Sequence, residues 1–140
     1  MSTSTYTRER RIRFSDCDPA GIVFYPQYFV MLNGLVEDWI DQGLGIDYAN
    51  LVLGRGVGLP TVHLEADFKA VSRLGDAVRL QLAVERLGTR SLTLQLRCVG
   101  RERDDDLRMS LRQVIVTTSL ESHGAIPIPA DLREAIERRP

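Results

Sequence analysis

The chain has 140 residues, enough for one domain with a sizeable core, and we expect a single domain over residues 1–140. Its 18 basic and 19 acidic residues leave a formal net charge of −1, so no overall positive field favours nucleic acid as a partner. Neither a secretory leader nor a run of about 18 apolar residues is visible, so we expect a cytoplasmic protein with no membrane partner. Cys17 and Cys98 are too few for a disulfide framework and are expected as free thiols.

The first elements expected are a strand, a tight turn and a helix. Polar and apolar side chains alternate through residues 8–15, which predicts a half-buried strand. The run from Asp18 to Gly21 contains Pro and Gly in the order typical of a tight turn. Because proline loses nothing at the start of a helix, a helix is expected to begin near Tyr25 and Pro26.

Residues 27–42 have the pattern of one amphipathic helix. Apolar side chains recur there at steps of three and four, and Gly43 is a suitable residue for ending the helix. The apolar positions are Tyr28, Leu32, Leu35, Val36, Trp39 and Ile40. Residues 54–58 are rich in glycine and predict an irregular connection.

The rest of the chain is expected to form a sheet. Apolar and polar residues alternate over residues 62–69, 78–85 and 92–98, and an apolar run over 109–120 predicts a fourth strand. The turns between these strands are short, so the strands are predicted to be antiparallel and to follow one another as a meander. A short surface helix is expected over residues 130–138. The most economical packing is an α+β fold in which a curved antiparallel sheet of about five strands wraps around the long helix.

Asp18 is the main candidate for a catalytic residue. A carboxylate can act as a nucleophile or can activate water, and the unpaired N–H groups of a helix start can stabilise an oxygen that gains negative charge. The alternative is that Asp18 only caps the turn, as Asp often does. Asp16 is interpreted as a solvated or turn-bonding carboxylate, and Cys17 has no neighbouring His that would activate it as a nucleophile.

The run DCDPAGIVFYP at residues 16–26 resembles the signature of the 4-hydroxybenzoyl-CoA thioesterase family of hotdog-fold proteins. This resemblance implies that Asp18 is the catalytic carboxylate, that an oxyanion-binding amide lies near Tyr25, and that Gly21 allows close approach of the backbone. It also implies hydrolysis through a mixed anhydride, although the residues alone leave general-base catalysis open. Similar proteins pair their sheets into dimers, with active sites at the subunit boundary, and often form tetramers, so we expect a homo-oligomer.

Several residues are candidates for binding an acyl-CoA substrate. Phe24 and Tyr28 are candidates for lining an acyl pocket, although aromatic residues on a helix are more often part of the core. Asn33 lies where the resembled family carries an acidic residue that meets the ring hydroxyl. The turn residues Arg90 and Ser91 are candidates for binding the phosphates of coenzyme A, with a role as an ordinary solvated turn left open. Glu65 is a second carboxylate that could reach the site of a neighbouring subunit.

We therefore predict a thioester hydrolase that cleaves a small aromatic, benzoyl-type, or a short- to medium-chain acyl-CoA without a metal or other cofactor. Asp16 and Asp18 have no nearby His partner for a metal, and no Gly-x-Ser-x-Gly elbow is present. His63 is interpreted as a structural histidine on the outer sheet face. Two alternatives stay open: a non-catalytic acyl-CoA or acyl-carrier-protein binding module, and a hotdog hydratase or dehydratase, which would need a His near the helix.

Overall fold

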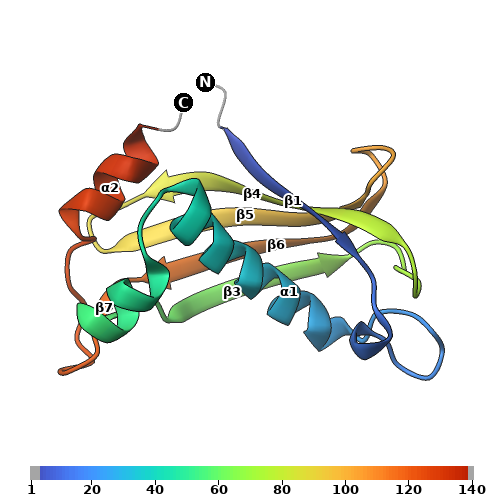
Figure 1. Ribbon diagram of the computed structural model, residues 1–140, viewed down its shortest axis with the longest axis horizontal. Helices are drawn as coiled ribbons and strands as arrows, with labels where there is room; N and C mark the ends of the chain where they lie inside the picture. Colours follow the sequence, from blue (N-terminus) through green and yellow to red (C-terminus); the bar gives the residue numbers. More distant parts are fainter. Residues whose placement is uncertain (1–3, 139–140) are drawn as a thin grey trace.

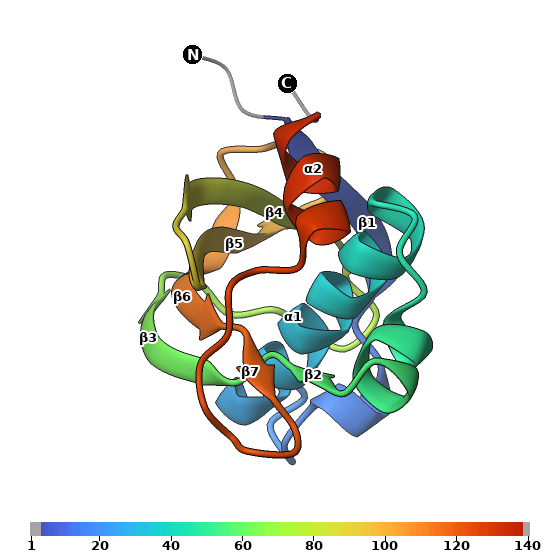
Figure 2. The same ribbon diagram turned by 90° about the vertical axis from the view of Figure 1, so that its left-hand side faces the viewer.

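A five-stranded sheet that curves around one long helix makes up most of the molecule (Figures 1 and 2). The computed structural model describes residues 4–138. All neighbouring strands of the sheet are antiparallel, in the order β1-β4-β5-β6-β3. The strands are β1 (Thr5–Arg11), β3 (Thr61–Phe68), β4 (Ala77–Leu87), β5 (Ser91–Gly100) and β6 (Leu107–Val116). The predicted α+β architecture and the number of strands in this sheet are confirmed.

The central helix α1 (Tyr25–Asp38) begins where the sequence predicts, with Pro26 in its first turn. It continues without interruption into a π-helical turn, η2 (Trp39–Gly43), so the helical stretch ends at the predicted glycine. Its apolar side faces the concave side of the sheet and forms the core with the inward side chains of β4, β5 and β6. The buried residues of α1 and η2 are Tyr28, Met31, Leu32, Leu35, Val36, Trp39, Ile40 and Gly43.

The first strand differs from the prediction at its C-terminal end. β1 stops at Arg11, and residues Phe14–Asp16 form a 3₁₀ turn, η1, instead of continuing the strand to residue 15. Ile12 is fully buried, but Phe14 is 79% exposed, so the predicted alternation of buried apolar and exposed polar residues does not continue past Ile12. The turn is favoured because the carboxylate of Asp16 accepts a hydrogen bond from the backbone amide of Arg13, at 2.8 Å.

The strand order corrects the prediction of a simple meander. Strands β4, β5 and β6 are consecutive neighbours, but β3 pairs with β6 at the far edge, because β1 occupies the free edge of β4. Residues 69–76 therefore form a crossing connection from the far edge of the sheet to β4, where the sequence indicated only a short turn at Gly75. This connection passes the end of the molecule that carries the start of α1 (Figure 1).

The remaining elements are short. The glycine-rich connection contains a π-helical turn, η3 (Asn50–Gly54), and β2 (Val57–Gly58), which pairs with β7 (Thr118–Ser119). The turn η3 and the strand β2 were not predicted, and the predicted fourth strand, residues 109–120, is divided into β6, which ends at Val116, and β7. The C-terminal helix α2 (Ala130–Glu137) begins at the predicted residue. Among the described helices, none has the length and apolar character needed to cross a membrane.

Candidate active site at the start of α1

The segment before α1 folds into a narrow hairpin around Asp18. Cys17 and Val23 form an antiparallel bridge, and the amide of Gly21 donates to the carbonyl of Asp18 at 2.9 Å. Gly21 has a φ of 77°, in the left-handed region that favours glycine, so it closes the hairpin after the turn at Pro19. The conformation is therefore encoded locally by the order Asp-Pro-Ala-Gly.

The carboxylate of Asp18 is half-buried, and only one of its two oxygens accepts a hydrogen bond within the described residues. Oδ1 accepts the backbone N–H of Ala20 at 2.9 Å, which fixes the rotamer of the side chain. The other oxygen, Oδ2, accepts no hydrogen bond from any of residues 4–138. The turn-capping role and a chemical role for Asp18 are thus compatible, because each uses a different oxygen.

The first turn of α1 presents an amide donor at Tyr25. Pro26 has no N–H, and the N–H of Gln27 donates to the carbonyl of Phe24 at 2.8 Å. The amide of Tyr25 has no acceptor within the described residues, and it lies at the positive end of the helix dipole. Such an amide can stabilise an oxyanion, as the sequence predicts for Tyr25.

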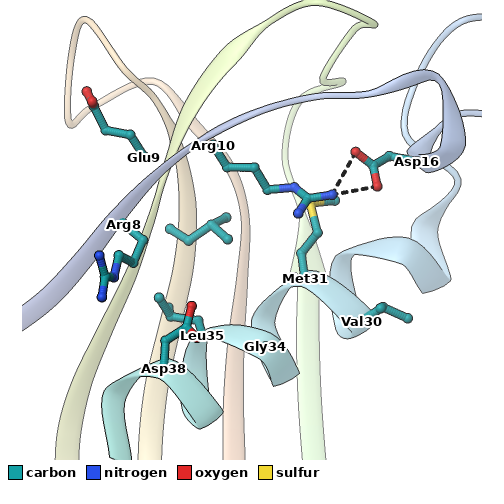
Figure 3. Close-up of a pocket in the computed structure, with 10 residues that line it drawn as sticks. Arg8, Glu9, Arg10, Asp16, Val30, Met31, Gly34, Leu35 and Asp38 are labelled. Atoms are coloured by element: carbon teal, nitrogen blue, oxygen red, sulfur yellow. Dashed lines mark hydrogen bonds and ion pairs between the residues drawn. The ribbon is translucent and has the colours of Figure 1, made fainter. Parts of the chain in front are cut away.

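The second carboxylate of the motif, Asp16, has a different environment. Its side chain is only 5% exposed and accepts two hydrogen bonds from Nη2 of Arg10, at 2.8 and 3.0 Å (Figure 3). With the Arg13 amide as a third donor, both oxygens are occupied. The turn-bonding role predicted for Asp16 is confirmed, but this carboxylate is buried rather than solvated. Asp16 therefore ties η1 to β1.

Replacing Asp16 with Asn is expected to lower the free energy of unfolding by about 1–3 kcal/mol, because the partly buried guanidinium of Arg10 would lose its charged partner. Denaturant unfolding followed by circular dichroism measures this change. The activity at saturating substrate, assayed where the variant is fully folded, is expected to remain within a few-fold of native. A variant as stable as the native chain would contradict the structural role of Asp16.

The cysteine between the two carboxylates is poorly suited to act as a nucleophile. Burial and the neighbouring charges of Asp16 and Asp18 raise the pKa of the Cys17 thiol, and the thiol lies 3.4 Å from the carbonyl of Arg13. Burial raises the pKa of Cys98 to about 12 in the core. No group of three or more metal-ligating side chains is present within residues 4–138.

A hollow of about 320 Å³ lies between α1 and the edge strand β3. Its walls are mostly apolar, but three polar side chains also reach it, and Nε2 of Gln113 donates to Oγ1 of Thr61 at 2.7 Å. The lining residues are Phe29, Val30, Asn33, Thr61, Leu64, Leu111 and Gln113. Asn33 is thus one of the polar residues of this hollow. Gln113 was not predicted as a site residue, although its polar side chain interrupts the inward-facing apolar positions of β6.

An aromatic cluster joins the start of α1 to the end of β3. The ring of Phe68 lies 6.0 Å from that of Tyr25 and 6.3 Å from that of Phe29. Phe24 is largely exposed and packs edge-on against Tyr25 at 5.7 Å. Tyr28 does not line the hollow: it is buried in the core, and its hydroxyl donates to Ser72 at 2.8 Å. Tyr28 is therefore a core residue in this chain, the alternative that the sequence left open.

Three other candidates lie away from Asp18 within the chain. Glu65 pairs with His63 at 2.9 Å on the sheet face opposite α1, and this hydrogen bond lowers the pKa of Glu65. Arg90 and Ser91 lie at the turn between β4 and β5, next to α2. That turn is at the opposite end of the 11-residue strand β4, roughly 35 Å from the end that carries the motif hairpin.

A curved antiparallel sheet wrapped around one long helix is the architecture of the hotdog fold. Residues 12–136 match the model of the thioesterase-like superfamily, and the chain belongs to this family. The hotdog fold and the thioester hydrolase class predicted from the sequence are thereby confirmed.

Named relatives and solved structures agree with this assignment. The chain is 31% identical over 135 residues to 4-hydroxybenzoyl-CoA thioesterase of Pseudomonas sp. (strain CBS-3), covering 91% of this chain and 94% of that protein. It is 30% identical over 80 residues to 1,4-dihydroxy-2-naphthoyl-CoA hydrolase of Synechocystis sp., covering 57% of each protein. The crystal structure of an aspartate-to-asparagine mutant of 4-hydroxybenzoyl-CoA thioesterase, complexed with 4-hydroxybenzoyl-CoA, superposes with a TM-score of 0.83 at 25% identity, covering 94% of this chain and 98% of that one.

Proposed function

We propose that the protein hydrolyses an acyl-CoA thioester to a free acid and coenzyme A, with Asp18 as the catalytic carboxylate. One observation carries this proposal: a hairpin and the helix that follows it present two groups suited to the reaction. The first is the carboxylate of Asp18, in which only Oδ1 accepts a hydrogen bond, and the second is the amide of Tyr25, which has no acceptor within residues 4–138. The family and the names of the relatives support the same chemistry.

The thioester carbonyl would accept a hydrogen bond from the Tyr25 amide, which stabilises the negative charge that develops on the oxygen. Asp18 Oδ2 would either attack the carbonyl carbon, giving a mixed anhydride that water cleaves, or remove a proton from the attacking water. In both routes the thiolate of coenzyme A is expelled and takes up a proton. Both routes proceed without a metal or a redox cofactor.

The acyl group would occupy the hollow between α1 and β3. The volume of the hollow, about 320 Å³, is at the lower end of the range of small-molecule sites, which favours a small acyl group. The apolar walls suit an aromatic ring, and the amides of Asn33 and Gln113 can each donate or accept a hydrogen bond at a ring hydroxyl. Because two relatives are named for hydroxylated aromatic acyl groups, a hydroxylated aromatic acyl-CoA is the first candidate, ahead of a short- or medium-chain one.

A second copy of the chain would cover the edge of β3 and close this hollow. Within the described sheet β3 pairs on one side only, and its edge carries the exposed apolar side chains of Val62, Leu64 and Phe68. The opposite edge strand, β1, presents a run of charged residues from Arg8 to Arg11, which discourages strand addition. The apolar edge therefore favours a two-fold dimer through β3, while pairing of dimers into tetramers stays a prediction.

Such a dimer also gives the turn at Arg90 and Ser91 a role. Antiparallel pairing of two β3 strands about a two-fold axis places the motif end of one subunit beside the opposite end of its partner. Arg90 of the partner subunit would then lie near the coenzyme A bound at this subunit's Asp18. Within one chain the same two residues are separated by the length of β4.

A panel of thioesters tests the proposed function. Release of free thiol is measured from benzoyl-, hydroxybenzoyl-, dihydroxynaphthoyl-, phenylacetyl- and straight-chain acyl-CoA. We expect the highest kcat/KM for a hydroxylated aromatic member, because only that class uses both the apolar walls and the amide of Asn33. If none of the panel is hydrolysed but several members bind, the chain is an acyl-CoA binding module and the proposal is wrong.

A further inference from the structure

The motif hairpin is held in place by the connection that crosses from β3 to β4. The amide of Val23 donates to the carbonyl of Ser72, and the amide of Leu74 donates to the carbonyl of Gly21, each at 2.9 Å. Ile22 and Arg73 form an isolated antiparallel bridge between the same segments. The return arm of the hairpin, which leads directly into α1, thus pairs with residues 69–76 rather than with a strand of the main sheet.

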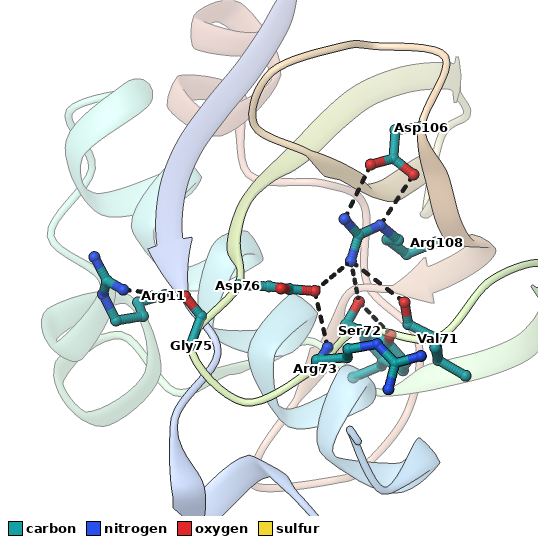
Figure 4. Close-up of polar contacts among 9 residues, drawn as sticks. Arg11, Val71, Ser72, Arg73, Gly75, Asp76, Asp106 and Arg108 are labelled. Atoms are coloured by element: carbon teal, nitrogen blue, oxygen red, sulfur yellow. Dashed lines mark hydrogen bonds and ion pairs between the residues drawn. The ribbon is translucent and has the colours of Figure 1, made fainter. Parts of the chain in front are cut away.

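The guanidinium group of Arg108, on β6, holds this connection. Its Nη1 donates to the carboxylate of Asp76 at 2.9 Å and to the backbone carbonyl of Val71 and the hydroxyl of Ser72, each at 3.3 Å (Figure 4). The other side of the fork donates to both oxygens of Asp106, at 2.9 and 3.1 Å. The side chain of Arg108 is 13% exposed, and its hydrogen bonds with Asp106 and Asp76 raise its already high pKa further.

Ser72 connects this group to the helix. It is 1% exposed, and its hydroxyl accepts a hydrogen bond from the hydroxyl of Tyr28, in the first turn of α1, at 2.8 Å. Its backbone carbonyl holds the hairpin through Val23, while its hydroxyl also faces Arg108. One buried residue therefore contacts the hairpin that carries Asp18, the helix that carries the Tyr25 amide, and the guanidinium fixed on the sheet.

We propose that Arg108 and Ser72 are positioning residues that set the placement of the Asp18 carboxylate relative to the Tyr25 amide. This inference rests on the proposed function, because the two groups must act on the same carbonyl. Neither positioning residue lines the acyl hollow. Their effect is on the geometry of the transition state, where a displacement of about 1 Å can lower the rate by as much as about 10²-fold.

The test replaces Arg108 with Gln and, separately, with Lys. We expect Arg108→Gln to lower kcat by about tenfold or more with little change in KM, because substrate contacts remain while the reacting groups shift. Arg108→Lys keeps the charge and a contact with Asp76 but lacks the fork, so it should recover part of the lost kcat. Assays are run well below the melting temperature of each variant, so that unfolded protein does not contribute to the loss.

Arg112→Gln is the matched control. Arg112 lies on the same strand, and its Nε and Nη2 donate to Oε2 of Glu85 at 2.9 and 2.7 Å, on the sheet face opposite α1. The kcat of Arg112→Gln is expected to stay within about twofold of native, since an exposed ion pair contributes little to the stability of the fold. An equal loss of kcat in both glutamine variants would show a general effect of losing an ion pair, and would overturn the proposal.

Two gentler variants keep the proposal testable if Arg108→Gln does not fold. Tyr28→Phe and Ser72→Ala each remove one hydroxyl from the same network, and each is expected to lower kcat more than it raises KM. Folded variants with native kcat at both positions would overturn the proposal.

The proposed function and the positioning role fail in different ways. A native chain that hydrolyses no thioester would contradict the function itself, and an Asp18→Asn variant with native activity would contradict the role of Asp18 in it. An active native chain that loses its activity in Asp18→Asn, but keeps a native kcat in Arg108→Gln, would contradict only the positioning role. A double-variant cycle adds an independent readout. If Arg108 acts by positioning Asp18, Arg108→Gln should cost much less in the Asp18→Asn background than in the native one.

Discussion

Replacing Asp18 with Asn is expected to lower kcat for thioester hydrolysis by about 10²–10⁴-fold while leaving the fold intact. The amide side chain can keep the hydrogen bond from Ala20 through its oxygen, so the hairpin should persist. What is lost is the free carboxylate oxygen, which supplies the nucleophile or the base. Thiol release under saturating substrate measures kcat, and circular dichroism confirms that the variant is folded.

Asp105→Asn is a suitable control for this experiment. Asp105 is an exposed carboxylate in the turn between β5 and β6, and it forms an ion pair with Arg103 on the surface. Its removal is expected to leave kcat unchanged. The dissociation constant of the intact thioester from Asp18→Asn should be close to the KM of the native chain, because the acyl hollow and the Tyr25 amide remain. An Asp18→Asn variant within tenfold of native kcat would exclude the role assigned to this carboxylate.

Placing a charge on the free edge of β3 is expected to abolish both dimer formation and activity. In Val62→Arg, a guanidinium replaces an apolar side chain that is 58% exposed on this edge and does not line the acyl hollow. Each such charge would lie in the apolar interface, beside the motif end of the partner's β3, and the cost of desolvating it would oppose association. Light scattering after size-exclusion chromatography should show a shift to the monomer mass, and kcat/KM should fall by at least about 10²-fold, because the partner no longer closes the site.

Leu53→Arg is the matched control, since Leu53 is 85% exposed in η3, outside the apolar edge. It should retain the native mass and activity. A mixed dimer gives a second check on the arrangement of the site. Co-produced Asp18→Asn and Arg90→Glu chains would form one site with both native residues if Arg90 acts across the interface, and this site would have a native KM. A mixture without a site of native KM would place Arg90 in its own chain's site, and an Arg90→Glu homodimer with a native KM would place it outside the site.

The features that could be predicted from the sequence depend on residues close together in the chain. The order Asp-Pro-Ala-Gly specifies the hairpin around Asp18, since it needs only a residue that tolerates positive φ at Gly21. Pro26 marks the start of α1, so the helix start could be located from the residue order alone. The spacing of apolar residues likewise located the helix and four of the five strands of the main sheet closely.

The features that the sequence did not reveal depend on competition between distant segments. Whether β3 pairs with β4 or with β6 is decided by β1, which occupies the edge of β4. The crossing of residues 69–76 past the hairpin follows from that choice, and with it the contacts of Ser72 and Arg108. The burial of Asp16 against Arg10 is also a tertiary effect, because the same residue order would suit a solvated turn.

The sequence by itself therefore determined the chemical groups and their local geometry: a carboxylate in a glycine-closed turn, followed by the start of a helix at Tyr25. These depend on backbone sterics and hydrogen bonds within a few residues. Only the tertiary structure decided what surrounds them, namely the polar side chains of Thr61 and Gln113 in the hollow, the support from β6, and the distance of Arg90 from Asp18. Such contacts depend on which strands become neighbours, and strand neighbours are selected by the packing of the whole chain.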